Sequence, residues 1–113
     1  MLKIHSYPSL RSPVLLCAMS GWSDAAFVAS GALRYLIAKR KSERIAEFDS
    51  DAVYSYTLTR PMTTLQSGKR VFRWPDLIWE ALPVPEASHD LVVLVGPEPD
   101  LRWRECVEAT MDY

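Results

Sequence analysis

The chain has 113 residues, of which 49% are hydrophobic and 24% are charged. This composition is that of an ordinary globular protein and excludes disorder over most of the length. Thirteen Lys and Arg residues balance fourteen Asp and Glu residues, so no whole-chain field attracts nucleic acid or an anionic membrane.

The first elements predict a strand, a helix and a second strand. The apolar residues 14–19 lie between turn residues, which is typical of a strand covered on both faces. Ser23 or Asp24 can cap the following helix, because apolar residues then recur at helical spacing to about Arg40. Residues 44–49 predict the second strand. This order favours a right-handed crossover and a parallel pairing of the two strands.

A hairpin and a short helix are expected next. Residues 63–65 and 69–74 flank the turn-forming sequence Gln66-Ser67-Gly68, and their polar character places this hairpin at an edge or projecting from the sheet. Residues 75–82 carry an apolar side that predicts a short helix.

The last elements are a strand and a helix. Residues 91–95 are uniformly apolar and are the clearest prediction of a buried strand in the chain. A final helix is expected from about Asp100, and the chain stops at Tyr113 within this helical pattern. We therefore expect residues 1–113 to form a single α/β domain that is truncated at its C-terminus.

The sequence gives no sign of a membrane protein or a secreted one. No apolar run approaches the roughly 20 residues that cross a bilayer, and the N-terminus lacks the apolar core of a signal peptide. Cys17 and Cys106 are too few for a disulfide scaffold. These features predict a cytoplasmic protein.

Two loops are the best candidates for a functional edge. Residues 20–24 and 96–100 each follow one of the two most apolar strands, and the carboxyl ends of parallel strands form the ligand-binding edge of open α/β sheets. Each loop precedes a helix, so Asp24 and Asp100 are either helix caps or contacts to a ligand or partner. The candidate binding residues are Gly21, Trp22, Ser23, Asp24, Arg60, Glu98 and Asp100.

The role of each candidate has alternatives. Trp22 is either an anchor for a partner or part of the core. Arg60 is expected to pair with Asp24 or Glu98 across the edge. Neither loop is rich enough in glycine to cradle phosphates, and neither a nucleophile elbow nor metal-ligand spacing is present. We therefore assign no catalytic residue, metal or cofactor.

The edge motifs also resemble those of a known family. Gly21-Trp22-Ser23-Asp24-Ala25-Ala26 resembles the Gly-Trp-Asn-Asp-Ala-Gly signature of the PAC2 (proteasome assembly chaperone 2-like) family, with Ser23 and Ala26 departing from it. Further matches are Asp49, Asp51, Tyr54, Arg60-Pro61, Trp74-Pro75, and Gly96-Pro97-Glu98-Pro99 followed by Trp103. The resemblance extends over about residues 10–110, and it is strongest to the actinobacterial branch.

The resemblance implies a three-layer α/β/α domain with a mostly parallel sheet, similar to nucleoside phosphorylases and peptidyl hydrolases. It also implies a protein-interaction domain without catalytic activity, a proteasome-related partner and homo-oligomers. One alternative is a hydrolase or phosphorylase-like enzyme that acts on a small molecule at the same edge. Another is a structural oligomer whose edge residues only cap helices.

Overall fold

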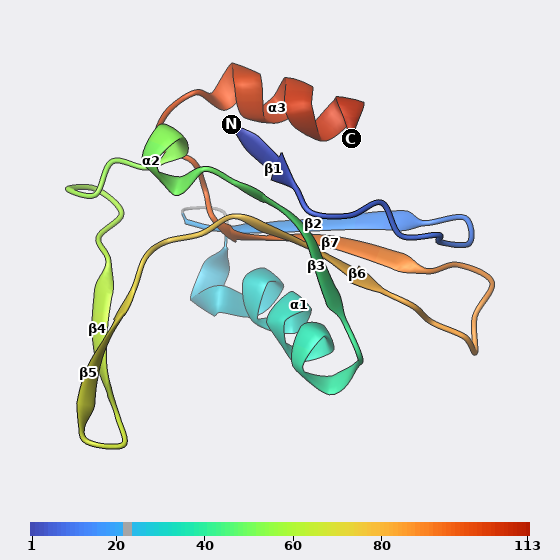
Figure 1. Ribbon diagram of the computed structural model, residues 1–113, viewed down its shortest axis with the longest axis horizontal. Helices are drawn as coiled ribbons and strands as arrows, with labels where there is room; N and C mark the ends of the chain where they lie inside the picture. Colours follow the sequence, from blue (N-terminus) through green and yellow to red (C-terminus); the bar gives the residue numbers. More distant parts are fainter. Residues whose placement is uncertain (22–23) are drawn as a thin grey trace.

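Two separate sheets form the framework of the computed structural model, which describes residues 1–21 and 24–113 (Figure 1). The larger sheet has five strands in the order β1-β3-β6-β7-β2. Their bounds are Leu2–Ile4 for β1, Val14–Ser20 for β2, Glu43–Phe48 for β3, Ile78–Leu82 for β6 and Leu91–Pro97 for β7.

The larger sheet is mixed, so the prediction of a three-layer α/β/α domain with a mostly parallel sheet is wrong. Among the described strands only β2 and β7 pair in parallel, from Val14 opposite Leu91 to Ser20 opposite Pro97. The pairings β7–β6, β6–β3 and β3–β1 are all antiparallel. The predicted direct pairing of the first two strands, β2 and β3, is also wrong, since β7 and β6 lie between them.

Strand β6 is the main cause of this difference. The apolar side of residues 75–82 predicts a short helix, yet Ile78–Leu82 is a central strand with all five residues buried. In so short a run, helical spacing cannot be distinguished from a strand that is covered on both faces. The hydrogen bonds to β3 on one side and β7 on the other decide the outcome.

One long helix covers each face of the larger sheet (Figure 1). Helix α1 (Val28–Lys39) packs on β2 and β7, where Leu33 joins a core cluster with Ala18 and Val93. Helix α3 (Trp103–Asp112) covers the opposite face and buries Cys106. The short helix α2 (Ser50–Val53) follows β3.

The helix predicted from residue 23 or 24 to about residue 40 is confirmed from Val28 to Lys39. It begins late because Ala26 and Phe27 have positive φ angles of 52° and 58°, and a short 3₁₀ turn, Ala25–Phe27, precedes it.

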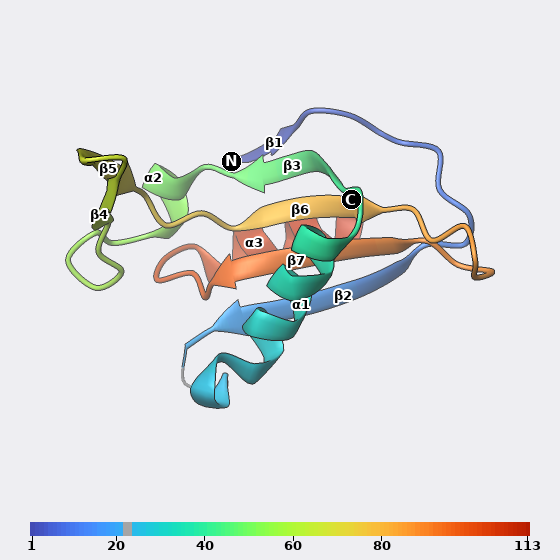
Figure 2. The ribbon, with the colours of Figure 1, turned by 90° about the horizontal axis from the view of Figure 1, so that it is seen from below.

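The predicted hairpin is confirmed and stands apart from the larger sheet. Strands β4 (Met62–Gln66) and β5 (Lys69–Arg73) form a sheet of their own. This sheet extends from the end of the molecule at which β2 and β7 terminate (Figures 1 and 2). We refer to residues 58–75 as the arm.

The other end of the parallel pair is held by Asp90. Its carboxylate accepts hydrogen bonds from the backbone N–H groups of Arg11 and Val84, each at 2.8 Å, and from the Arg11 guanidinium at 3.1 Å. These bonds, the Arg11 backbone bond first, lower the pKa of Asp90 to about 2. Asp90 thus fastens the segment before β2 to the segment before β7.

None of the helices that the structure describes has the length and apolar character needed to cross a bilayer.

Candidate functional site

The two predicted loops meet at one edge of the sheet. Ser20 and Pro97 are partners at the ends of β2 and β7, and the Glu98 N–H donates to the Ser20 carbonyl at 2.9 Å. A Cβ atom at Gly21 would lie 2.5 Å from a Glu98 side-chain oxygen. Glycine therefore allows the two loops to touch. Trp22 and Ser23 lie outside the described residues.

Asp24 has the geometry of a helix cap. It is only 7% exposed, and its carboxylate accepts from the N–H groups of Ala29 at 2.9 Å and Ser30 at 3.2 Å. The Ser30 hydroxyl also donates to it. These hydrogen bonds, the Ser30 hydroxyl first, hold the pKa of Asp24 below its usual value. Its charge is directed at the start of α1.

Asp100 holds a loop and does not cap the last helix. Helix α3 begins only at Trp103, after Arg102 in the left-handed conformation. The Asp100 carboxylate instead accepts from the Ser55 N–H at 2.9 Å and from the Thr59 hydroxyl at 2.8 Å. Asp100 therefore fixes the segment that leads into Arg60 and the arm.

Arg60 is exposed and does not make the predicted ion pair. Its Nε donates to the Thr57 carbonyl at 3.4 Å, and among the described residues no salt bridge joins it to Asp24 or Glu98. It lines a cavity of about 750 Å³ at the sheet edge together with Gly21 and Asp24. Two further guanidinium groups, from Arg34 and Arg73, line the same cavity.

The edge cavity therefore contains some of the predicted residues and not others. It brings together Gly21, Asp24 and Arg60, whereas Glu98 and Asp100 do not line it. Sequence reasoning missed Arg34 and Arg73. Arg34 is indistinguishable from any exposed helical residue, and the side-by-side placement of Arg73 and Arg60 depends on the arm.

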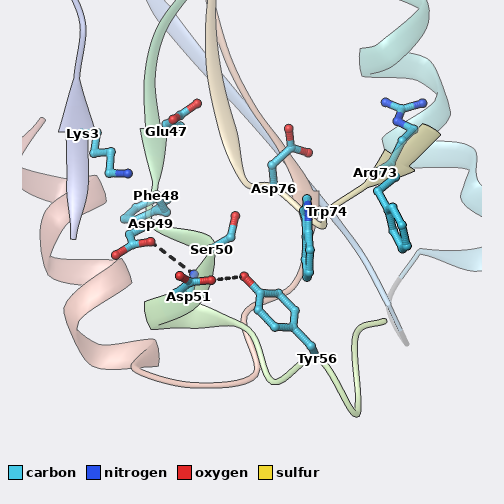
Figure 3. A pocket seen from close by; sticks show the side chains of 11 residues that line it. Lys3, Glu47, Phe48, Asp49, Ser50, Asp51, Tyr56, Arg73, Trp74 and Asp76 are labelled. Atoms are coloured by element: carbon cyan, nitrogen blue, oxygen red, sulfur yellow. Dashed lines mark hydrogen bonds between the residues drawn. The ribbon is translucent and has the colours of Figure 1, made fainter. Parts of the chain in front are cut away.

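A second cavity, of about 760 Å³, lies against the base of the arm (Figure 3). It shares Arg73, Trp74 and Asp76 with the edge cavity. Its remaining carboxylates come from Glu47, Asp49 and Asp51. The two neighbouring cavities thus differ in the balance of their charged side chains. The edge cavity has three arginines and two acids, whereas this one has four acids and two basic residues, Lys3 and Arg73.

An aromatic cluster forms part of the second cavity. The Tyr56 hydroxyl donates to Asp51 Oδ1 at 2.5 Å, and this bond is the main reason that the pKa of Tyr56 is raised to about 12. The Trp74 ring meets Tyr56 edge-on at 5.0 Å between centroids and stacks on Phe72 at 6.3 Å. Asp51 thereby orients Tyr56, the first ring of an aromatic row that continues through Trp74 to Phe72.

The side chains that line the two cavities are of kinds that bind other molecules. The two cavities present guanidinium, carboxylate and aromatic side chains. Neither histidine is among the residues that line the two cavities. His5 lies 3.9 Å from Glu47, and His89 contacts the Ser12 carbonyl at 2.7 Å. Within residues 1–21 and 24–113, no cluster of three or more His, Cys, Asp or Glu side chains is arranged to hold a metal ion.

Solved structures share this fold. A protein of unknown function from Corynebacterium glutamicum superposes with a TM-score of 0.83 over 99% of this chain and 44% of its own, at 24% identity. A PAC2 family protein from Streptomyces avermitilis superposes with a TM-score of 0.77 over 89% of this chain and 43% of its own, at 32% identity. A proteasome-assembly chaperone homologue from Mycobacterium tuberculosis superposes with a TM-score of 0.75 over 87% of this chain and 42% of its own, at 29% identity.

The sequence profile of the PAC2 family matches residues 18–113. The chain belongs to the PAC2 family, as its edge motifs indicated. It spans less than half the length of each of these three solved structures. No curated protein matches it.

Proposed function

We propose that this chain is a protein-interaction domain without catalytic activity, which acts in the cytoplasm as an assembly-chaperone-like protein and contacts a proteasome-related partner. The partner class is supported by the similarity to a proteasome-assembly chaperone homologue. The interaction role rests on the arm.

The observation that carries this proposal is the exposure of large apolar side chains on the arm. Met62 is 66% exposed, Leu65 74%, Phe72 64% and Trp74 56%. Exposed apolar side chains that gather on one element mark an interaction site, because leaving them in water is unfavourable. Aromatic residues in particular supply a large part of interface energy.

The register of the arm places several of these side chains in one row. Phe72 is the partner of Thr63, and Leu65 lies diagonally across from it on the same face of the hairpin. Trp74 continues this row, since it stacks on Phe72 and contacts Tyr56. The row therefore runs from the arm down to the body of the domain.

We include the sheet edge in the same interaction face. Arg60 and Met62 begin the arm and also line the edge cavity with Gly21 and Asp24. The face thus combines the arm with Gly21 and Asp24 at the sheet edge, and Gly21 lies next to Glu98. In this arrangement the arm supplies apolar contacts, and the edge supplies a cavity and polar side chains.

A pull-down with the full chain tests this function. The tagged protein is incubated with the cytosolic fraction of the source cells and with purified proteasome α-subunits, and captured proteins are quantified by mass spectrometry. Phe72→Ser removes the central aromatic group, while Trp22→Ala and Glu98→Ala test the edge. Tyr35→Ser is the matched control, because Tyr35 is an aromatic residue of α1 with a similar exposure of 62%.

We expect the wild type and the Tyr35→Ser variant to capture similar amounts of α-subunits. The Phe72→Ser variant should capture at least ten-fold less. Capture by the wild type that neither the arm nor the edge variants reduce would contradict the proposed face. Absence of α-subunits from both wild-type samples would contradict the proteasome-related partner.

A further inference from the structure

Positive charge is concentrated in the arm. Residues 58–75 contain four basic residues, Arg60, Lys69, Arg70 and Arg73, and no acidic one. The rest of the chain keeps nine basic and fourteen acidic residues, a net charge of −5. A nearly neutral protein therefore consists of an acidic body and a strongly basic arm.

The charges of the arm are not neutralised within the molecule. All four basic side chains are exposed, and none takes part in a salt bridge among the described residues. Exposed charges that lack an internal partner contribute little to stability. They are suited instead to steering and orienting a partner of opposite charge.

Cations and apolar side chains alternate on the arm. Arg70 is the cross-strand partner of Leu65, and Arg73 is the partner of Met62. Phe72 lies between these two arginines in sequence, with its side chain on the same face as Leu65 and Arg70. Each exposed apolar group therefore has a guanidinium close to it.

From this arrangement we infer that the partner docks on the arm through an acidic protein surface in which carboxylates alternate with apolar side chains. This inference rests on the proposed function and adds the chemistry of the partner. The guanidinium groups bind carboxylates, in a paired geometry where two N–H groups reach one carboxylate. The aromatic row receives the apolar side chains between them.

The surroundings of the arm favour a protein over a nucleic acid. Arginine and aromatic side chains together can also bind single-stranded nucleic acid by stacking. However, the cavity at the base of the arm is lined by Glu47, Asp49, Asp51 and Asp76, and these carboxylates repel a continuous phosphate chain. A protein surface, in contrast, can place its carboxylates opposite the arm and uncharged groups opposite the acidic cavity.

Fluorescence anisotropy with labelled probes tests the inference. The probes are three short peptides in which Leu alternates with Glu, Gln or Lys, and an oligouridine. Binding is measured at about 0.05 M and 0.3 M salt, because screening weakens contacts between exposed charges over this range. The double variant Arg70→Glu with Arg73→Glu reverses the arm's charge. A double variant of two exposed residues outside the arm, Lys41→Glu with Arg104→Glu, is the matched control.

We expect the wild type to bind the Glu peptide at least ten-fold more tightly than the Gln or Lys peptide at low salt. The preference should shrink at high salt, disappear in the arm variant and persist in the control variant. Equal binding of the three peptides, an unchanged preference in the arm variant, or tighter binding of oligouridine would overturn the inference.

The two proposals can fail independently. A wild type that captures α-subunits but shows no preference for the Glu peptide refutes the acidic partner and leaves the interaction role standing. A wild type that prefers the Glu peptide but captures no α-subunit refutes the proteasome-related partner and supports the chemistry inferred for the arm.

Discussion

Gly96 offers a quantitative test of how tightly the chain packs at the candidate functional edge. It lies in β7 with a φ of 156°, where side chains are rarely tolerated. A Cβ atom at this position would lie 2.2 Å from the Asp76 carbonyl oxygen and 2.9 Å from the Leu77 Cα. Both obstacles are backbone atoms of the segment just before β6, so they cannot move aside as a side chain does.

The cost of Gly96→Ala follows from these distances. Ordinary contact begins at 3.4 Å, so the backbone near Asp76 has to shift by about 1 Å. Such overpacking costs about 1–3 kcal/mol, and the unfavourable φ adds about 1 kcal/mol. We expect a loss of about 3 kcal/mol in the free energy of unfolding. At about 4 °C per kcal/mol for a domain of this size, the melting temperature falls by roughly 12 °C.

Gly31 provides the matched control. It lies inside α1, and a Cβ atom there meets nothing within 4 Å. Gly31→Ala should therefore raise stability by about 1 kcal/mol, the difference in helix propensity. Urea unfolding followed by circular dichroism measures both variants. A Gly96→Ala protein as stable as the wild type would refute the close approach of the backbone at Asp76 and Leu77 to Gly96.

Two further predictions concern titratable groups. Because the folded-state pKa of Asp90 is about 2 and its usual value is 3.8, its contribution to stability is complete above about pH 4 and is lost as the pH falls toward 2. Urea midpoints measured across this range should fall more steeply for the wild type than for Asp90→Asn, and parallel curves would contradict the role of Asp90. Asp51→Asn should lower the pKa of Tyr56 from about 12 toward 10.0, since the charged acceptor is lost. Phenolate absorbance in an alkaline titration measures this change, and superimposable curves for the two proteins would argue against the bond between Tyr56 and Asp51.

Those parts of the fold that have a strong local pattern could be predicted from the sequence. Strand β7 is a continuous apolar run whose residues 93–96 are buried, as its pattern predicts. Strand β2 is confirmed as a strand, but the prediction that it is covered on both faces is wrong, since only Ala18 of its residues is buried and Val14, Leu15 and Cys17 are exposed. The hairpin of the arm is marked by Ser67 and Gly68, which both adopt positive φ in its turn. In these segments local preference and tertiary structure agree.

The strand order could not be predicted, because it depends on contacts between distant segments. Strand β6 enters between β3 and β7, and β1 adds to the outer side of β3, both antiparallel to it. No local feature of residues 78–82 distinguishes such a strand from a short buried helix. The assumption that a strand–helix–strand segment forms adjacent parallel strands therefore led to the wrong fold class.

The candidate site shows a similar division. The meeting of the loops at Gly21 and Glu98 follows from the parallel pairing of β2 and β7. The sequence predicted that both loops lie at one edge, but not that these two strands are neighbours. The contact of Tyr56 with Trp74 does not follow from any spacing, since it requires the arm to fold back on the segment after α2. Asp49 and Asp51, which match the family's motifs but were not predicted among the binding residues, line a cavity for the same reason.

The structure also changes the expected charge of the candidate functional edge. In the sequence, Asp24, Glu98 and Asp100 make the two loops appear acidic. The structure turns Asp24 toward the N–H groups of α1 and Asp100 toward Ser55 and Thr59. Arginines from α1 and the arm line the cavity that remains open. Asp24 and Asp100 thus accept hydrogen bonds from donors within the fold, whereas no salt bridge among the described residues neutralises the basic side chains of the arm, and this difference is why the proposed interaction face is basic.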